Sequence, residues 1–103
     1  MYSVIYSTME NIEEARAIGR ILVEQKLVAC VTLLPGVESI YRWHGNIEED
    51  KECILLAKTT ENNREKTIQK IKELHSYDLP DIESFPLTQG LSQYLKWVED
   101  ETR

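Results

Sequence analysis

The segment HSYDLPDIESFPL, residues 75–87, concentrates the side chains of this chain that are best suited to ligand binding or proton transfer. It contains one of the two histidines and two of the three prolines. His75 is followed by Tyr77, and Asp78 and Asp81 supply carboxylates near the expected start of a strand. An imidazole beside carboxylates titrates near neutral pH and is a good ligand for transition metals. We therefore expect this segment to end a helix, to lead into a strand, and to be the best place for a ligand.

If the site binds a metal, copper is the ion that the imidazole and thiolate groups of this chain would suit, because copper prefers these ligands. His75 is the leading candidate metal ligand, and Cys30 and His44 are the others. The chain has no CxxC and no HxxxH, so a metal site within one local segment is not expected, although the fold or an oligomer axis could bring ligands together. Each candidate also has a structural alternative. Cys30 fits a small buried side chain, His44 a solvated turn residue, and His75 a helix C-terminus.

A small-molecule cleft is the second possibility for the same region. Lys58 leaves a predicted strand and is expected to project towards this end of the sheet, with a solvated lysine as the alternative. Tyr41 and Trp43 share one face of a predicted hairpin arm and would wall the cleft from a neighbouring subunit, although interface packing is the simpler use of both rings. The predicted ligand-binding cleft comprises Tyr41, Trp43, Lys58, Tyr77, Asp78 and Asp81.

The elements that must position these residues alternate between strand and helix patterns. Apolar, β-rich runs predict strands over residues 2–7, 27–34, 37–43, 52–59 and 81–86, with a turn at Pro35-Gly36 and a hairpin tip at His44-Gly45. Asn11 and Glu14 have capping-box spacing at the start of one helix, and Asn62 is the expected N-cap of another that ends near His75. A short C-terminal helix is expected around residues 94–98.

This order predicts a single α+β domain over residues 1–103. The succession β-α-β-β-α-β is the ferredoxin-like pattern, here with an extended hairpin and a short C-terminal helix. Two helices on such a sheet cover one face only, and apolar positions in the middle strands favour another protein chain on the other face. We therefore expect a homo-oligomer.

Charge and composition narrow the partners. The formal net charge of −6 disfavours nucleic acid and anionic membrane surfaces. The acidic run EEDKE is expected to be a solvated edge, with contact to a partner protein as the alternative. The N-terminal residues show neither a signal peptide nor a long apolar run, so we expect no membrane association and a cytoplasmic location. Cys30 and Cys53 lie in apolar runs, which is typical of buried thiols in a reducing compartment.

A family resemblance covers almost the entire chain. The stretch LVEQKLVACVTLLPGVESIYRWHGNIEEDKECILLAKT, followed by HSYDLPDI and YLKWVEDET, resembles the divalent-cation tolerance (CutA) family in order and spacing. The resemblance implies a ferredoxin-like subunit in a tight trimer, cytoplasmic residence, and a link to copper and other divalent cations. The chain departs from the usual pattern at four positions: Ser76 replaces a proline, Asp78 and Asp81 replace longer residues such as glutamate, and His44 stands where glutamate is frequent.

Three classes of function are open at this stage. The first is a trimeric protein of divalent-cation (copper) tolerance that binds a metal ion or a small ligand in clefts between subunits. The second is an enzyme that uses His75 with Asp78 or Asp81 as acid and base; we expect no enzyme, because the chain has no GxSxG, HExxH, P-loop or dinucleotide motif. The third is a non-catalytic interaction or signalling module that resembles the trimeric nitrogen-regulatory proteins, with metal binding incidental.

Overall fold

The computed structural model describes residues 1–103 and contains four strands and three helices. In chain order these are β1 (Tyr2–Met9), α1 (Ile12–Glu24), β2 (Cys30–Trp43), β3 (Asn46–Thr60), α2 (Glu61–Leu74), β4 (Ile82–Leu87) and α3 (Ser92–Glu101).

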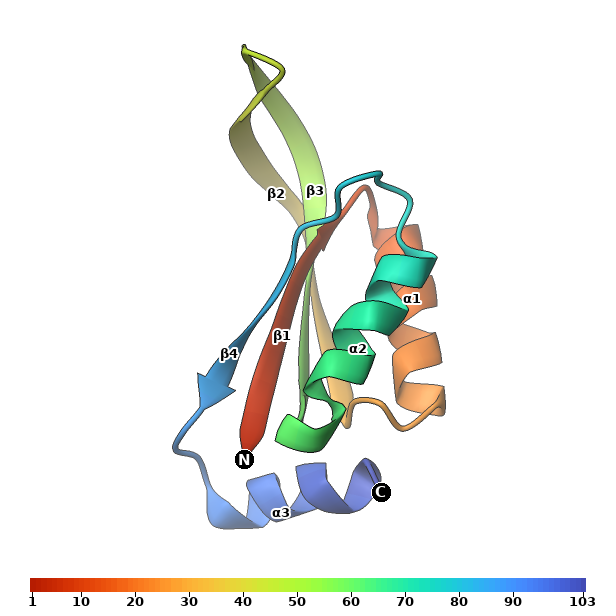
Figure 1. The fold of residues 1–103 in the computed structure, drawn as a ribbon, viewed down its shortest axis with the longest axis vertical. Helices are drawn as coiled ribbons and strands as arrows, with labels where there is room; N and C mark the ends of the chain where they lie inside the picture. Colours follow the sequence, from red (N-terminus) through yellow and green to blue (C-terminus); the bar gives the residue numbers. More distant parts are fainter.

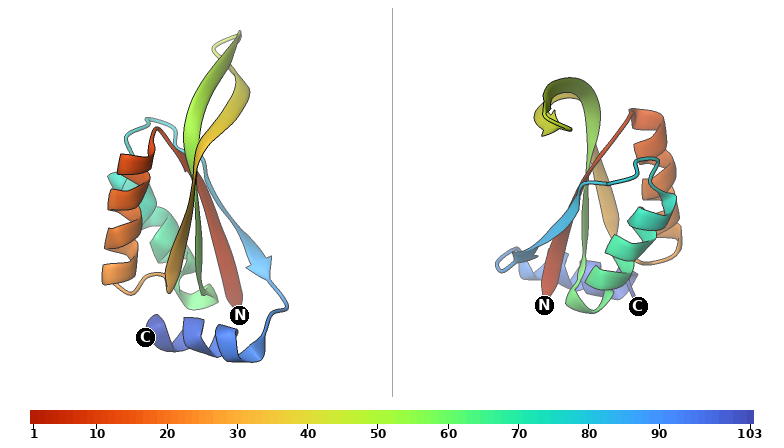
Figure 2. Two further views of the ribbon diagram at one scale, coloured as in Figure 1. Left: turned by 180° about the vertical axis from the view of Figure 1, so that it is seen from behind. Right: turned by 45° about the horizontal axis from the view of Figure 1, so that its top comes forward.

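The strands form one antiparallel sheet in the order β2-β3-β1-β4 (Figure 1). Helices α1 and α2 lie side by side against one face of the sheet, and α3 crosses its lower end near both chain termini (Figure 2). The predicted α+β class and β-α-β-β-α-β order are therefore confirmed. None of the helices has the length and apolar character required to cross a membrane.

The core lies between the sheet and the α1–α2 pair. Alternate residues of the two central strands face these helices, as the two-residue period of a strand requires, and Ile5, Leu55 and Ala57 are fully buried there. Leu22 of α1 and Ile71 of α2 close the core from the other side. The other residues of these strands alternate with the buried ones and point to the sheet face that no helix covers, where most of them are partly exposed.

The two helix starts differ in how well the sequence predicts them. The Asn11 side chain accepts the Glu14 amide hydrogen bond at 2.8 Å, as expected of a capping box. The expected cap at Asn62 is wrong, because α2 already begins at Glu61 and its N-cap residue, Thr60, makes no side-chain bond. Strand pairing carries the chain to Thr60, and the Glu61 amide then donates to the Met1 carbonyl at 2.9 Å.

The predicted turn at Pro35-Gly36 is a bulge within one continuous strand. β2 runs through both residues, and its register against β3 shifts between Leu34 and Val37. Gly36 has φ +72°, a conformation that glycine adopts without steric cost. The chain therefore bends here without reversing direction.

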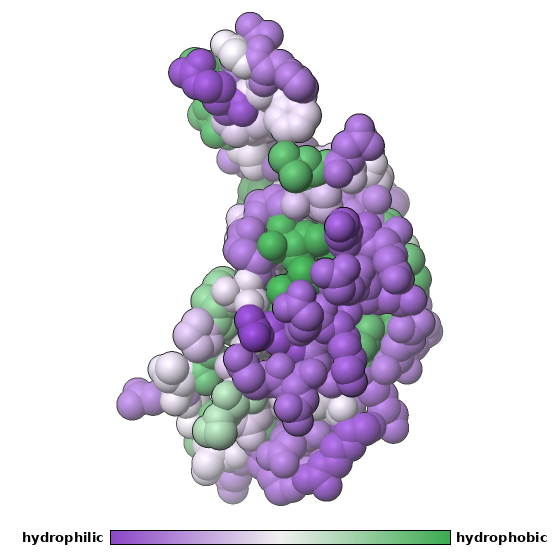
Figure 3. Space-filling model, viewed as in Figure 1, coloured by the Kyte–Doolittle hydropathy of each residue, from purple (hydrophilic) through white to green (hydrophobic).

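Beyond the bulge, residues 37–52 of β2 and β3 form a hairpin that we call the arm. Its tip is His44-Gly45, both with positive φ, as a two-residue hairpin turn requires. The arm stands off the body as a separate lobe (Figure 3) and accounts for the elongated shape of 45 × 25 × 22 Å. Ile40 and Ile47 on the arm are 68% and 66% exposed, so no core lies beneath it.

Candidate functional site

His75 fastens the segment between α2 and β4 to the end of β1. Its side chain is fully buried, with Nε2 2.8 Å from the Thr8 carbonyl oxygen and Nδ1 3.1 Å from the Tyr77 amide nitrogen. A carbonyl only accepts and an amide N–H only donates, so these partners assign a ring that is protonated on Nε2 and accepts at Nδ1. Both ring nitrogens are thus committed to the backbone.

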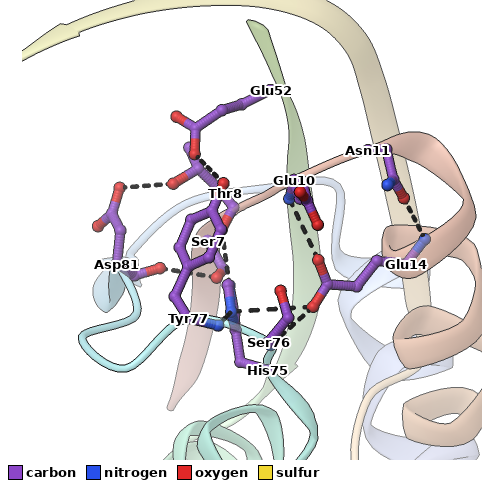
Figure 4. Close-up of polar contacts among 10 residues, drawn as sticks. All are labelled: Ser7, Thr8, Glu10, Asn11, Glu14, Glu52, His75, Ser76, Tyr77 and Asp81. Carbon is purple, nitrogen blue, oxygen red and sulfur yellow. Dashed lines mark hydrogen bonds and ion pairs between the residues drawn. The ribbon is translucent and has the colours of Figure 1, made fainter. Parts of the chain in front are cut away.

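The first turn of α1 holds the same segment from the other side (Figure 4). Glu14 accepts the Ser76 amide hydrogen bond through Oε2 at 2.8 Å and the Glu10 amide bond through Oε1 at 3.2 Å. Its Oε2 also lies 3.9 Å from His75 Nδ1. A single carboxylate therefore ties the start of α1 to the segment that follows α2.

Tyr77 and Glu52 connect this segment to the base of the arm. The Tyr77 hydroxyl donates to Glu52 Oε2 at 2.8 Å, and the two side chains point towards each other in Figure 4. Burial, followed by the hydrogen bond to this carboxylate, raises the pKa of Tyr77 well above its ordinary value. Glu52 itself is only 9% exposed. The phenol therefore remains a neutral donor at physiological pH.

Asp81, immediately before β4, also connects the segment after α2 to β1. Its carbonyl accepts a hydrogen bond from the Ser7 hydroxyl at 2.7 Å, and its Oδ2 accepts one from the Thr8 hydroxyl at 3.1 Å. Asp81 also acts on Glu83, two residues along the chain. The hydrogen bond shared with Asp81, followed by partial desolvation and the like charge of Asp81, raises the pKa of the mostly exposed Glu83 to about 7.

The arm presents aromatic side chains on the side that faces the segment 77–81. The Tyr41 hydroxyl donates a hydrogen bond to Asp50, which raises the pKa of Tyr41 to about 12. Tyr41 and Trp43 are 41% and 43% exposed, and the Trp43 ring meets that of His44 edge-on at 4.7 Å between centroids. These rings are thus accessible to a ligand.

Between the arm and the segment 77–81 lies a cavity of about 700 Å³, which we call the arm pocket. Its walls come from β1, both strands of the arm and the segment that precedes β4. The lining residues are Thr8, Glu10, Ser39, Tyr41, Trp43, Asp50, Lys51, Glu52, Tyr77, Asp78, Leu79 and Asp81.

Five of the six predicted cleft residues line this pocket: Tyr41, Trp43, Tyr77, Asp78 and Asp81. Within one subunit, the two arm aromatics already line this pocket together with the segment 77–81, and their contribution from a neighbouring subunit stays a prediction. The sixth predicted residue, Lys58, does not line the pocket. It pairs with Val4 near the other end of the sheet, and its Nζ lies 5.7 Å from the centre of the Tyr94 ring.

The three predicted metal ligands are not brought together. His44 is at the tip of the arm, His75 is buried against the Thr8 carbonyl of β1, and Cys30 lies at the opposite end of the sheet, 3.3 Å from the Tyr94 hydroxyl. No group of three or more histidine, cysteine or acidic side chains has a geometry that could hold a metal ion. The side chains of one subunit therefore do not fit a copper centre.

The carboxylates of the arm strand β3 are missed by the sequence argument, which assigns the run EEDKE to a solvated edge. The length of the hairpin turn is the feature of the sequence that could have predicted the position of these carboxylates. With two turn residues at 44–45, Tyr41 pairs with Glu48 and Ser39 with Asp50, so side chains 48, 50 and 52 must share the face of the arm aromatics.

The model of the family described as CutA1 divalent ion tolerance protein matches residues 3–101. The chain is 42% identical over 102 residues to the divalent-cation tolerance protein CutA of Thermus thermophilus, and the match covers 99% of both chains. The solved structure of the Thermus thermophilus protein superimposes with a TM-score of 0.96 and full coverage of both chains. The CutA structure from Archaeoglobus fulgidus gives a TM-score of 0.97 at 34% identity, again over both full chains.

Some relatives are longer than this chain and occupy other compartments. The chloroplastic CutA of Arabidopsis thaliana is 36% identical over 97% of this chain, which spans only 55% of that relative. The Archaeoglobus fulgidus structure is described as that of a periplasmic protein. These findings overturn the expectation of a cytoplasmic location, because proteins of this fold and sequence are described from other compartments.

Proposed function

Because the chain belongs to the CutA1 divalent ion tolerance protein family, we propose that it acts in tolerance of divalent cations, copper among them. The observation that carries this proposal is the 42% identity, over 99% of both chains, to a protein named for divalent-cation tolerance. The test is growth of a strain that lacks its own family member in graded copper, zinc and cobalt. Expression of this chain should restore growth at metal concentrations that stop the empty-vector strain, and failure with all three metals would contradict the proposal.

The protein acts through a ligand in the arm pocket, without a metal ion held inside one subunit. Copper would require imidazole or thiolate groups in one place, and the buried ring of His75 has no free lone pair. His44, the remaining imidazole, is exposed at the arm tip. In copper titration calorimetry, His44→Ala should therefore remove any weak copper binding, and His75→Ala should leave that binding unchanged.

The protein works as a homotrimer. Support comes from the sheet face opposite α1 and α2, where Leu34 and Phe85 are 42% and 47% exposed, and from Ile40 and Ile47 on the arm. Apolar side chains this exposed favour association with another chain. Sedimentation equilibrium should give three times the subunit mass, and Ile40→Asp should shift the distribution towards smaller species. A stable monomer would contradict the trimer.

The action is non-catalytic, in contrast to the alternative that pairs His75 with Asp78 or Asp81 as acid and base. A general base needs a free lone pair within reach of a substrate proton, whereas Nδ1 of this ring accepts the Tyr77 amide and Nε2 donates to Thr8. Turnover of a defined substrate that His75→Ala abolishes, in a variant that remains folded, would contradict this proposal.

A further inference from the structure

One nitrogen of the His75 ring has two competing partners. Nδ1 accepts the Tyr77 amide hydrogen bond at 3.1 Å, and the Glu14 Oε2 atom lies 3.9 Å from the same nitrogen. An unprotonated Nδ1 can bond only to the amide, because an ionised carboxylate has no hydrogen to donate. A protonated Nδ1 can bond only to the carboxylate, because an amide N–H does not accept. A single proton therefore decides which of the two groups the ring binds.

The other contact of the ring does not depend on this proton. Nε2 lies 2.8 Å from the Thr8 carbonyl oxygen, and it carries a hydrogen both in the neutral tautomer assigned above and in the imidazolium. The His75 side chain is fully buried, and that of Glu14 is 16% exposed. All of these groups belong to one subunit and lie within its fold, so association with another chain removes none of them.

The charges around the ring favour its protonated form over a buried cation without a partner. Glu14 of α1 is the one ionisable side chain within ion-pair distance of the ring. Glu10 and Glu52 add negative charge beside the adjacent Tyr77, and Lys72, in the last turn of α2, is exposed and takes part in no ion pair. The ring also stands at the C-terminal end of α2, whose carbonyls attract a positive charge. A buried imidazolium is costly unless its charge is paired, and Glu14 supplies that pairing.

We propose that His75 and Glu14 form a pH-sensitive switch that controls the segment 77–81. When Nδ1 takes up a proton from solvent, the ring leaves the Tyr77 amide and pairs with the Glu14 carboxylate. The amide then loses its acceptor, which loosens the segment at the residue whose hydroxyl bonds to Glu52 at the base of the arm. Because this segment lines the arm pocket, the ring controls how firmly that wall is held. The use of the switch rests on the proposed function, whereas its existence is tested without metal or ligand.

The test is NMR spectroscopy of the intact protein between pH 8 and pH 5, in which the His75 ring nitrogens and the Tyr77 amide are followed together. Long-range ¹H–¹⁵N spectra should show the Nε2-protonated tautomer at pH 8 and the imidazolium at lower pH. The protection factor of the Tyr77 amide corrects for the intrinsic effect of pH on hydrogen exchange. It should fall about tenfold as the ring gains its proton, which is the effect of losing one hydrogen bond.

Two variants of neighbouring residues identify the partner of the protonated ring. Glu14→Gln removes the charge that pairs with the imidazolium, and should move the titration of the His75 ring to lower pH. Glu13→Gln removes the same charge from an exposed position in the same turn of α1, and its His75 titration should match that of the wild type. His44, the other histidine of the chain, lies at the arm tip and is an internal reference that neither variant should change.

Three results would overturn the proposal: a His75 ring that stays neutral down to pH 5, a Tyr77 amide whose protection is constant while the ring titrates, or the same ring titration in Glu14→Gln and Glu13→Gln. The first two are measured on the wild type, so they decide the matter even if circular dichroism shows that Glu14→Gln does not fold. The growth assay described above tests the proposed function separately. Rescue of growth without the switch removes this inference alone, whereas a working switch without rescue removes the role in metal tolerance.

Discussion

Strands β2 and β3 pair along nearly their whole length, but their two halves lie in different surroundings. In the body, Leu55 and Ala57 are fully buried beneath α1 and α2. In the arm, Ile40 and Ile47 are mostly exposed, and the hairpin is held by its backbone ladder, its turn and a few side-chain bonds. The same two strands thus form a packed sheet and a projecting ribbon. Comparing the two halves therefore separates the stability that comes from hydrophobic burial from the stability that comes from strand pairing alone.

The largest contrast should come from shortening one apolar side chain in each half. Leu55→Ala removes fully buried atoms and should lower the free energy of unfolding by about 2–5 kcal/mol. Ile47→Ala, at a site that is 66% exposed in one subunit, should cost less than Leu55→Ala, and its cost should depend on protein concentration because the proposed trimer covers this side chain. Guanidinium unfolding at two protein concentrations measures both variants. A loss from Ile47→Ala that equals the loss from Leu55→Ala at both concentrations would contradict this contrast.

The two histidines provide the next contrast, with one substitution made at both positions. His75→Asn removes a buried ring that bonds to the backbone through both nitrogens, and should cost about 2–3 kcal/mol. His44→Asn keeps a residue that tolerates positive φ at the exposed tip, and should change stability by less than about 0.5 kcal/mol. Thermal unfolding distinguishes the two. Equal losses would show that the 75–81 segment is not fastened as described.

The two tyrosine–carboxylate pairs refine the comparison further. Tyr77→Phe leaves Glu52 buried without its donor and should cost about 1–3 kcal/mol. Tyr41→Phe releases Asp50 into solvent on the arm and should cost less than about 1 kcal/mol. Urea unfolding of the two variants measures the difference. A larger loss of unfolding free energy from Tyr41→Phe than from Tyr77→Phe would contradict this prediction, because the arm hydrogen bond would then contribute more to stability.

The smallest predicted effect concerns pH. Because the folded-state pKa of Glu83 is raised from 4.5 to about 7, the folded protein binds the extra proton more tightly than the unfolded chain. Its contribution to stability is complete below pH 4.5 and is lost as the pH rises through about 7. Glu83→Gln should therefore stabilise the protein at pH 8, by less than about 1 kcal/mol because the side chain is exposed. Melting temperatures at pH 5 and pH 8 provide the check, and a gain at pH 5 alone would contradict it.

The sequence predicts the fold well because its signals are local or periodic. The apolar run that contains Cys30, the capping pair Asn11 and Glu14, and the glycine at the hairpin tip each specify their element without knowledge of the rest of the chain. The failures have tertiary causes. Pairing of β1 with β3 moves the start of α2 ahead of Asn62, and a bulge replaces the turn expected at Pro35-Gly36 because β3 continues to pair beyond it.

The candidate site was only partly predictable for the same reason. Tyr77 and Asp81 belong to one short segment whose composition is unusual, so their grouping could be predicted. Glu52 lies 25 residues from Tyr77 in the chain and is distinguished only by its burial, which no local pattern indicates. The predicted position of Lys58 near the segment 77–81 is wrong, because its place at the end of a strand does not by itself specify which end of the sheet the side chain approaches.

The bulge at Pro35-Gly36 restricts how this arm can change in length. From Leu34 to Val37, β2 advances by three residues while β3 advances by two, and this extra residue sets Tyr41 on the face of Glu52. Loss or gain of one residue in β2 alone would turn the aromatic rings away from the pocket, or else rebuild the tip. Paired additions of two residues in each strand would keep the rings in place and extend the arm by about 7 Å. The arm can therefore change in length only by an even number of residues in each strand if the aromatic rings are to remain in the pocket.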